Sequence, residues 1–365
     1  MKDPVFWGIV TGNVVVALLL AGAAWFVCRV LPREPWKTAV RQIRRRPVVL
    51  ASLAMLLLYT FVALLDSVSW RDVRTDAQGR SIQAPKGSSV LDRLCTPLRN
   101  AQETTYSAPL ADSQFSRNLI RLPDGTSRWE SKPLNHPGKH LMGTDKVGQD
   151  VFYRALKGIR TAMLLGALTL LIAVPFAVFF GVVAGYFGGW ADDVIQYVYT
   201  TVASIPSILL IAAFVLIFGR GLTQICIILG ITSWTGLCRL TRAETLKLRE
   251  LEYVQAAVAI GTSRARILLK HVAPNLMHLV LIHAVLQFSG LVLAESVLAY
   301  VGVGVGPETG SWGNMINSAL LELSRDPKVW WNLAGAFLLM FGLVLPANLF
   351  GDALRDALDP RLRQR

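Results

Sequence analysis

Residues 252–275 read Glu-Tyr-Val-Gln-Ala-Ala-Val-Ala-Ile-Gly-Thr-Ser-Arg-Ala-Arg-Ile-Leu-Leu-Lys-His-Val-Ala-Pro-Asn, a charged segment between two apolar blocks. Apolar residues recur at helical spacing on both sides of Gly261, which predicts two short amphipathic helices. They are Val254, Ala257 and Val258 before the glycine and Ile267, Leu268 and Val272 after it. Gly261 can supply the bend between them without steric cost. Pro274 is expected to end the second helix. Held against a membrane with its basic side chains outward, such a helix–turn–helix is a candidate docking site for another protein.

The composition predicts a membrane protein with several helical spans. Of the 365 residues, 53% are hydrophobic and 17% are charged, against about 25% charged residues in a typical soluble domain. Long uncharged segments account for the difference and predict an all-α, polytopic membrane fold in a lipid bilayer. The net charge of +13 does not indicate nucleic-acid binding, because the basic residues collect in loops between apolar segments, as in cytoplasmic loops of membrane proteins.

Seven apolar segments are long enough to cross a bilayer at about 1.5 Å per residue. Their approximate ranges are 5–30, 48–65, 159–186, 194–218, 222–237, 278–301 and 333–350. A cleaved signal peptide within residues 1–25 is the alternative for the first, but its uncharged run is long for such a peptide. Alternation with the basic loops places the N-terminus outside and the C-terminus in the cytoplasm.

These spans divide the chain into five predicted parts. They are an extra N-terminal span with a basic segment (1–47), a second span (48–66), an extracytoplasmic loop or lobe (67–150), a core domain (151–351) with a cytoplasmic loop at 239–276, and a cytoplasmic tail (352–365). The extracytoplasmic part is expected to be a small ordered lobe, with a mobile linker as the alternative. One inner turn, at Asp192 and Asp193, is acidic and departs from the positive-inside pattern.

No nucleotide-binding or hydrolytic motif is present. The sequence contains no G-x-x-x-x-G-K-[ST], no H-E-x-x-H and no G-x-S-x-G. His278 and His283 are five residues apart, so they do not share the helix face that a metal-binding pair uses. The sequence therefore predicts neither a metal site nor a catalytic centre, and an enzyme is disfavoured.

Four polar side chains in the sixth predicted span are candidates for a translocation path. Glu295 lies well inside the span, where carboxylates are costly and often functional, but it can equally hydrogen-bond to a neighbouring helix. Gln287, Ser289 and Ser296 can also face a path, and joining helix to helix is again the alternative.

Other residues predict how the spans are shaped and packed. Glycines of the third span, including Gly166, Gly181 and Gly185, allow helices to approach closely. Residues 204–206, Ser-Ile-Pro, predict a kink in the fourth span. Tryptophans near the last span suit the membrane–water interface. These are Trp312, Trp330 and Trp331.

The 252–275 segment resembles a known motif. Gln255-Ala-Ala, with Gly261 six residues on and Pro274 nineteen on, is similar to the EAA loop of bacterial ABC importer permeases (Glu-Ala-Ala-x3-Gly-x9-Ile-x-Leu-Pro). Within that group the chain resembles the C-type permease of the dipeptide/oligopeptide/nickel family. The further matching stretches are His140–Asp150, Ala184–Trp190, Ser311–Gly313 and Gly351–Arg361.

The resemblance implies a type I ABC importer transmembrane-domain fold, with six core spans plus one extra N-terminal span, in the cell inner membrane. It implies a heterodimer with a B-type permease, two cytoplasmic ATPase subunits that bind ATP and Mg, and a periplasmic or lipid-anchored binding protein that delivers a peptide. No cofactor is expected in this chain. The implied ATPase-coupling residues are Glu252, Gln255, Ala256, Ala257, Gly261, Arg264, Arg266 and Pro274.

The chain departs from the family pattern at several positions. Gln255 replaces the Glu that gives the loop its name, which puts a specific ion pair to the ATPase in doubt. His271 and Ala273 replace Ile and Leu, and Gln149 replaces Arg in the stretch that ends at Asp150. The extra span and residues 67–139 have no counterpart in the six-span core, and we expect residues 67–139 to cap the outer mouth or to contact the binding protein.

The cargo is open at this stage. Di- or oligopeptides are expected, and a nickel chelate, a peptide antibiotic or an antimicrobial peptide are alternatives for the same machinery. A stand-alone carrier or channel is the alternative of a different class, and it would have no use for the motif at residues 255–274.

Overall fold

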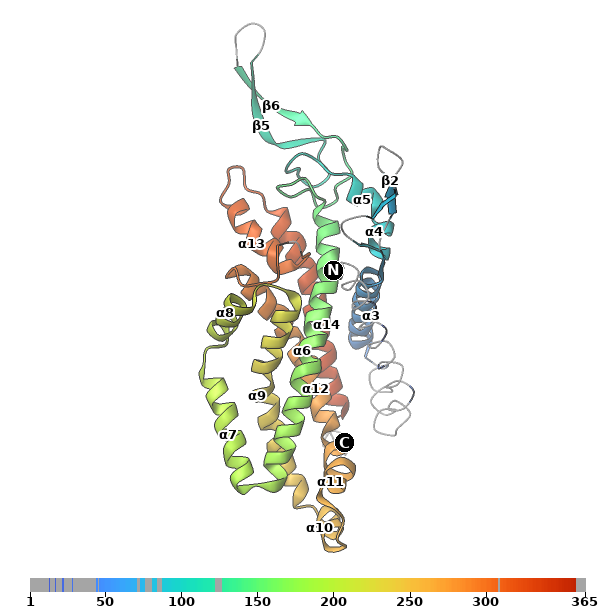
Figure 1. Ribbon diagram of the computed structural model, residues 1–365. Coiled ribbons are helices and arrows are strands. Elements are labelled where there is room, and N and C mark those ends of the chain that lie inside the picture. The colour runs from blue at the N-terminus through green and yellow to red at the C-terminus, as the bar shows by residue number, and fades with distance from the viewer. Residues whose placement is uncertain are drawn as a thin grey trace. The chain divides into compact units, whose positions relative to one another are not determined.

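The computed structural model describes residues 46–70, 73–75, 81–83, 87–121, 127–307 and 309–358, with single residues at 13, 17, 22, 28 and 44 (Figure 1). The predicted first span and residues 359–365 of the predicted tail lie outside this part. The chain divides into two compact units. The first comprises Met1–Thr38, Ala54–Met163 and Pro307–Leu343, and the second comprises Ala39–Leu53, Leu164–Gly306 and Val344–Arg365.

Five helical segments in the described residues are long and apolar enough to cross a membrane. They are α3 (Pro47–Ser67), α6 (Val151–Phe187), α9 (Leu222–Arg249), the composite segment Arg264–Tyr300 and α14 (Trp331–Leu358). A sixth candidate is the pair α7 (Gly189–Ser204) and α8 (Ser207–Phe218), which are bent by 84°. The all-α prediction is confirmed. Each predicted span after the first coincides with one of these six segments. A span is expected to be helical, because a helix satisfies its own backbone hydrogen bonds in lipid.

Several boundaries differ from those expected. Helix α6 begins eight residues before the predicted start, because the Oδ1 of Asp150 accepts a hydrogen bond from the backbone N of Tyr153 at 2.9 Å and caps the helix early. Helix α9 continues to Arg249, so the first part of the predicted loop 239–276 is helical. Helix α14 continues to Leu358, so the predicted tail begins as a helix. The break after Ser204 is sharper than the expected kink, since no helix crosses it.

In the first unit, the polar segment after α3 is built from short elements (Figure 1). Three antiparallel strand pairs are formed by β1 (Ser69–Trp70) with β4 (Ser88–Ser89), β2 (Val73–Thr75) with β3 (Ser81–Gln83), and β5 (Ser113–Arg121) with β6 (Ser127–Pro133). Short helices α4 (Val90–Leu94) and α5 (Thr96–Asn100) follow β4, and α13 (Trp312–Leu323) completes the unit. The described part of residues 67–150, called the lobe below, thus forms short strands and helices, and the choice between an ordered lobe and a mobile linker stays a prediction.

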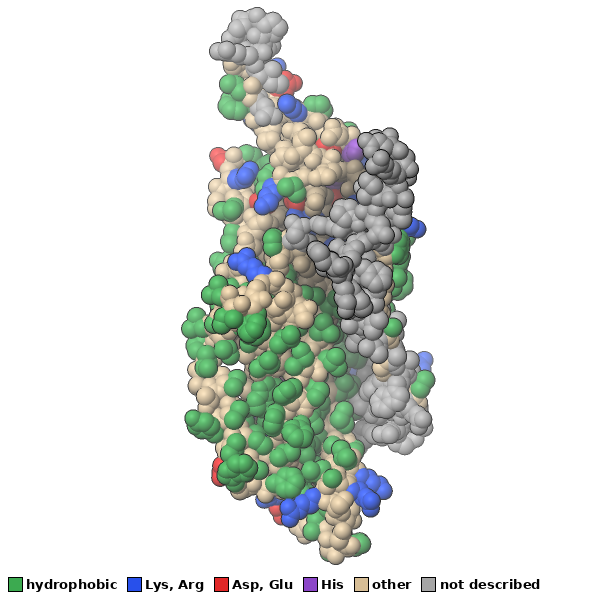
Figure 2. Space-filling view, in the orientation of Figure 1, with side chains coloured by type: hydrophobic (Ala, Val, Ile, Leu, Met, Phe, Trp, Pro, Cys, Tyr) green, Lys and Arg blue, Asp and Glu red, His purple; other side chains and the backbone are tan. Residues whose placement is uncertain are grey.

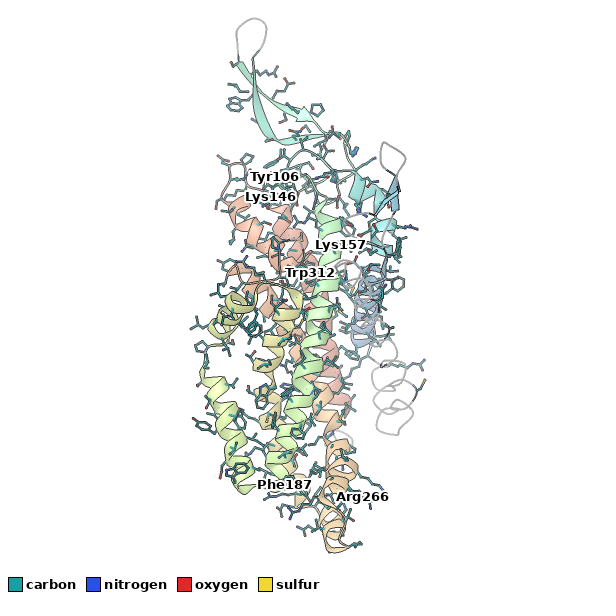
Figure 3. The ribbon with its side chains drawn as sticks, in the orientation of Figure 1. Tyr106, Lys146, Lys157, Phe187, Arg266 and Trp312 are labelled. Atoms are coloured by element: carbon teal, nitrogen blue, oxygen red, sulfur yellow. The ribbon has the colours of Figure 1, made fainter. Side chains whose placement is uncertain are left out.

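A buried ion cluster fastens the lobe to the helices of the first unit. The ammonium of Lys157 on α6 lies 2.5 Å from Asp66 Oδ1 and 2.9 Å from Asp92 Oδ1. The hydroxyls of Ser89 and Tyr153 donate to Asp66 and Asp92, each at 2.7 Å. Both carboxylates are buried, so the cluster ties α3, α4 and α6 together, and Figure 3 labels Lys157 on α6.

Two of the three tryptophans expected at the membrane interface are core residues instead. Trp312 and Trp331 are each 2% exposed, whereas Trp330 is 56% exposed. The indole N–H of Trp312 donates to the carbonyl of Ala155 at 2.8 Å, and that of Trp331 donates to the carbonyl of Thr144 at 2.9 Å. The interfacial prediction is wrong for these two, because their polar atoms find backbone partners inside the first unit.

In the second unit, glycines of α6 set the distance between helices, as predicted. A methyl group at Gly181 would overlap the side chain of Thr241, and one at Gly185 would lie 2.6 Å from Cβ of Thr245, so α6 and α9 pack in close contact. A methyl group at Gly166 would overlap the ring of Phe288 on α12 (Ala273–Tyr300). Figure 2 shows hydrophobic side chains gathered over the outer face of this unit, as expected of helices in lipid.

Candidate functional site

The segment that contains the EAA-like motif forms a helical hairpin at the end of α9. Helix α10 (Glu252–Ala259) is followed by a turn, by the single-turn helix α11 (Arg264–Ile267) and by a π-helical turn, Leu268–Val272, that leads into α12. Residues 252–275, called the coupling hairpin below, thus connect two apolar helices. Figure 3 labels Arg266 on the hairpin and Phe187 at the adjoining end of α6.

Gly261 makes the turn of the coupling hairpin. Its φ angle is +79°, a left-handed conformation that residues with a side chain rarely adopt. The backbone N–H groups of Gly261 and Thr262 donate to the carbonyls of Val258 and Ala257 at 2.9 and 3.0 Å, the bonding pattern of a Schellman C-cap. The space around Gly261 is open, so the backbone conformation alone requires glycine here. The predicted bend is present.

Pro274 does not end the second helix of the hairpin, contrary to the sequence prediction. The helical stretch from Arg264 to Tyr300 is continuous, and Pro274 occupies a first-turn position of α12. A proline ring clashes with the carbonyl four residues earlier, which here belongs to Lys270. Lys270 lies inside the π-helical turn, whose wider winding moves that carbonyl away and lets the helix pass the proline.

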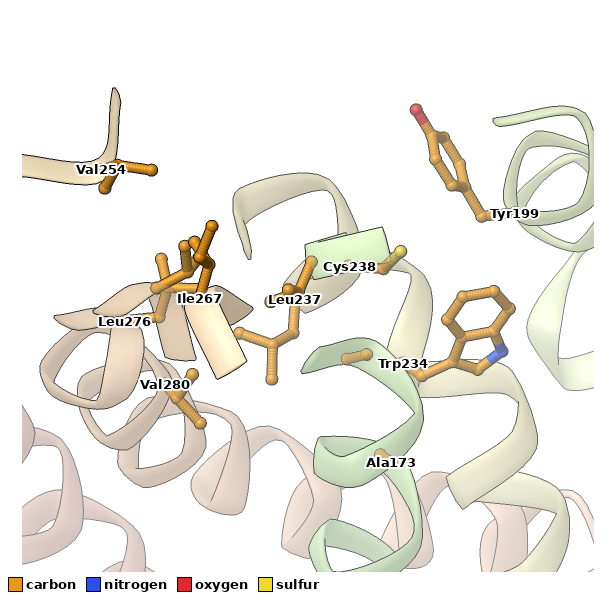
Figure 4. Packing of buried hydrophobic residues seen from close by; sticks show 12 residues of the cluster. Ala173, Tyr199, Trp234, Leu237, Cys238, Val254, Ile267, Leu276 and Val280 are labelled. Atoms are coloured by element: carbon orange, nitrogen blue, oxygen red, sulfur yellow. The ribbon is translucent and has the colours of Figure 1, made fainter. Parts of the chain in front are cut away.

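Both halves of the hairpin are anchored in one apolar core. Val254 on α10, Ile267 on α11 and Val272 in the π-helical turn are each no more than 1% exposed. They belong to one cluster with Trp234 and Leu237 of α9 (Figure 4). A displacement of the hairpin would therefore be carried directly to α9 and α12, because close-packed cores transmit strain.

The tip of the hairpin exposes apolar side chains. Ile260 is 83% exposed, Leu269 is 75% exposed and Val258 is 54% exposed. The sequence pattern placed Val258 on the buried face of its helix, and the structure corrects this, because Val254 is the residue of α10 that packs inward. Exposed aliphatic side chains around a tight turn are suited to insertion into a groove of another protein.

The polar candidates of the motif also lie on the surface of the hairpin. Glu252, Gln255 and Ala256 are exposed on α10, whereas Ala257 is half-buried against the core. The amide of Gln255 donates to the carbonyl of Glu250 at 3.2 Å and is the side chain that stands where the family has Glu.

The basic candidates follow the turn. Arg264 and Arg266 are both exposed, and Pro274 is exposed two residues after the π-helical turn. The guanidinium of Arg264 lies 5.8 Å from the ring centroid of Phe187, within cation–π range, so this side chain also ties α11 to the end of α6. The structure thus gathers six of the eight predicted residues around the turn and places Glu252 and Pro274 at the base.

A polar contact across the base of the hairpin was not predicted. The amide of Asn275 donates to the hydroxyl of Tyr253 at 3.0 Å, and the rings of Tyr253 and His271 lie 6.2 Å apart. His271 stands where the family motif has Ile. Because its ring lies beside that of Tyr253, it takes part in closing the base of the hairpin. The separation of 22 residues between Tyr253 and Asn275 carries no sequence signal that would have revealed the pair.

The acidic inner turn is explained by a partner on α9. The guanidinium of Arg242 donates to both carboxylate oxygens of Asp192, at 2.5 and 2.6 Å. Arg249 donates to the carbonyl of Gly185 at 3.2 Å. A bidentate Arg–carboxylate pair fixes geometry as well as charge, so the α6–α7 turn is held to α9 directly beside the hairpin.

The four candidates for a translocation path lie along α12. Ser289, Glu295 and Ser296 are buried by this chain's own helices, at 3%, 4% and 7% exposure. The amide of Gln287 donates to the carbonyl of Ser233 on α9 at 3.2 Å, which is the helix-joining contact given as its alternative. A role of the four in a path remains a prediction.

Comparison with known proteins identifies the family. The sequence profile of the "binding-protein-dependent transport system inner membrane component" family matches residues 177–364, which include the whole coupling hairpin. The oligopeptide transport system permease protein OppC of Haemophilus influenzae is 35% identical over 226 residues, covering 62% of this chain and 72% of that protein. The chain belongs to this family.

Two other relatives are also named as peptide permeases. The dipeptide transport system permease protein DppC of Bacillus subtilis is 33% identical over 225 residues, covering 62% of this chain and 70% of the relative. A putative peptide permease of Brucella suis is 34% identical over 225 residues, covering 61% and 74%. The permease is therefore a multi-pass membrane component of a binding-protein-dependent transport system, and its part in that system is transport rather than catalysis.

Proposed function

We propose that this permease carries di- or oligopeptides across the inner membrane as the C-type transmembrane subunit of an ABC importer. The similarity to permeases named for oligopeptide and dipeptide transport supports this cargo. The nickel-chelate and antibiotic alternatives use the same machinery, and no feature of the described residues favours them.

The observation that carries the proposal is the coupling hairpin. It presents exposed Ile260 and Val258 on a turn whose other face is anchored to α9 and α12. Each of two cytoplasmic ATPase subunits would accept such a hairpin, one from this chain and one from a B-type permease. ATP and Mg would bind to the ATPase subunits. Closure of the ATPase pair would then move the hairpins as rigid bodies and switch the access of the spans.

The proposed orientation follows from the charges. The hairpin carries Arg264, Arg266 and Lys270, and such short basic segments remain in the cytoplasm. The N-terminus is then outside and the C-terminus inside. The lobe between α3 and α6 would face a periplasmic or lipid-anchored binding protein, which delivers the peptide.

Transport by the reconstituted complex tests the proposal. Proteoliposomes containing the permease and its co-purified subunits should accumulate a labelled tripeptide when ATP and the binding protein are supplied, and a nickel chelate should not compete. Gly261→Asp should abolish ATP-driven uptake while the complex still inserts, because the turn loses its left-handed glycine and its apolar tip gains a charge.

A matched control is Gly219→Asp. Gly219 also has a positive φ angle, +85°, and open surroundings, but it lies between α8 and α9. Uptake by this variant should stay near that of the wild type. Normal uptake by the Gly261 variant would refute the docking role, whereas uptake of the nickel chelate in place of the peptide would refute the cargo.

A further inference from the structure

A cavity of about 360 Å³ opens among α9, α12 and the end of α14, all within the second unit. Its lining consists of five aliphatic side chains, two histidines and one arginine. This volume falls in the range of small-molecule sites. The residues that line the cavity lie outside the coupling hairpin, and neither the family nor the relatives' names assign the cavity a ligand.

The cavity lies at the level where two apolar helices, α9 and α14, become charged. Leu240 directly follows Arg239, the first charged residue of α9. Arg355 follows Asp352, the first charged residue of α14. Such transitions mark the boundary between the hydrocarbon region and the headgroups. The cavity therefore spans the level at which lipid phosphates lie.

The cavity lining includes one permanently cationic side chain, that of Arg355. Arg355 is exposed in the last turn of α14, and within the described ranges no ion pair involves its guanidinium. Asp356 beside it pairs instead with Arg46 at 2.9 Å. His278 on α12 adds a second nitrogen donor to the same cavity. A guanidinium and an imidazole that line the same cavity are suited to a phosphate group.

Most of the remaining lining is aliphatic. Leu279, Ile282 and Leu286 continue along α12 from His278 toward the middle of the span. A ligand that fits this lining has an anionic phosphate joined to a hydrocarbon chain. A peptide fits less well, because none of the described residues that line the cavity is a carboxylate that could receive its amino terminus.

We propose that this cavity binds an anionic phospholipid, with the phosphate at Arg355 and His278 and one acyl chain along Leu279, Ile282 and Leu286. Basic pockets between transmembrane helices recognise lipid headgroups in this way. The bound lipid would fill the space between α9 and α12, the two helices to which the coupling hairpin is anchored.

Native mass spectrometry of the full-length permease, purified with the subunits that accompany it, tests the proposal. The delipidated protein is titrated with dioleoylphosphatidylglycerol, with dioleoylphosphatidylcholine and, separately, with inorganic phosphate. We expect tight binding of one phosphatidylglycerol and weaker binding of the zwitterionic lipid. Arg355→Ala should weaken binding of the anionic lipid about fivefold, the effect of one basic residue near a membrane surface.

Two further variants separate the possible sources of the signal. Lys247→Ala removes a cation whose side chain is 73% exposed and pairs with Glu244 outside the cavity, so lipid binding should not change. Ile282→Trp fills the aliphatic part of the lining and should weaken phospholipid binding while leaving binding of inorganic phosphate unchanged. Equal effects of Arg355→Ala and Lys247→Ala, no effect of Ile282→Trp, or displacement of the lipid by a labelled tripeptide would each overturn the proposal.

Discussion

Lys157 shows how a single residue can hold the lobe in place. Its ammonium satisfies two buried carboxylates, Asp66 and Asp92, that come from different elements. Sequence analysis identified neither the cation nor its partners, because the three positions are separated by 26 to 91 residues of polar sequence. By contrast, Gly261 was predicted correctly, since a glycine between two short helical patterns is a local signal.

Removing the cation should destabilise the first unit. Lys157→Met leaves Asp66 and Asp92 buried without their counter-ion, and we expect a loss of about 2–3 kcal/mol, since the Lys157 side chain is partly exposed. Hydrogen exchange of the amides of residues 88–100 measures the loss. The control Lys146→Met, at an exposed position of the same unit, should change exchange little.

The same cluster predicts a dependence on pH. Burial raises the pKa of Asp92, but hydrogen bonds from Lys157, Tyr153 and the backbone of Ser89 outweigh it and hold the pKa below its usual value. A carboxylate with a lowered pKa in the folded state stabilises it above the unfolded-state pKa, near 4, and this contribution is lost as the pH falls through the folded-state value.

Thermal unfolding between pH 6 and pH 3 checks this sign. The wild type should lose stability across the acidic range, and Asp92→Asn should lose less, because it has no carboxylate to protonate at that position. An equal acid dependence in both proteins would show that Asp92 contributes nothing to it.

At the scale of elements, the apolar segments predicted the helices, and the specific contacts decided where helices begin, bend and end. The bend between α7 and α8, the early start of α6 and the passage of α12 over Pro274 each depend on three-dimensional contacts or on local winding. The close approach of α6 to α9 and α12 was predictable, because glycine is the residue that permits it in membranes.

A size exchange between α6 and α12 tests this packing. Gly166→Ala places a methyl group against the ring of Phe288, and overpacking of this kind costs about 1–3 kcal/mol. Combining it with Phe288→Leu should restore part of the thermal stability in detergent. Gly236→Ala on α9, where the new methyl group meets no atom within 4 Å, serves as the control and should be neutral or stabilising.

The β5–β6 hairpin offers a surface for the proposed binding protein. Leu119 and Trp129 face each other across the two strands and are 55% and 64% exposed. Replacing both with Ala should reduce the stimulation of ATPase activity by the binding protein and leave the basal activity unchanged. If the stimulation is unchanged in this variant, the β5–β6 hairpin does not contact the binding protein.

At the scale of the whole molecule, the chain is the membrane component of a binding-protein-dependent transport system. Its sequence has no nucleotide-binding motif, its family is defined by dependence on a binding protein, and its coupling hairpin exposes apolar residues next to a rigid anchor. The sequence predicted the family and the place of the hairpin. It did not predict which side chains form the exposed tip, because the orientation of α10 is set by packing against α9.

Photo-crosslinking from Ile260 tests the central claim most directly. A photoreactive phenylalanine analogue placed at this position, in cells that contain the complete transporter, should form a covalent adduct with an ATPase subunit. The same analogue at Leu216, which is 82% exposed on α8, should not. An adduct from Ile260 with lipid alone, or with no ATPase subunit while the complex is assembled, would contradict the coupling role of the hairpin.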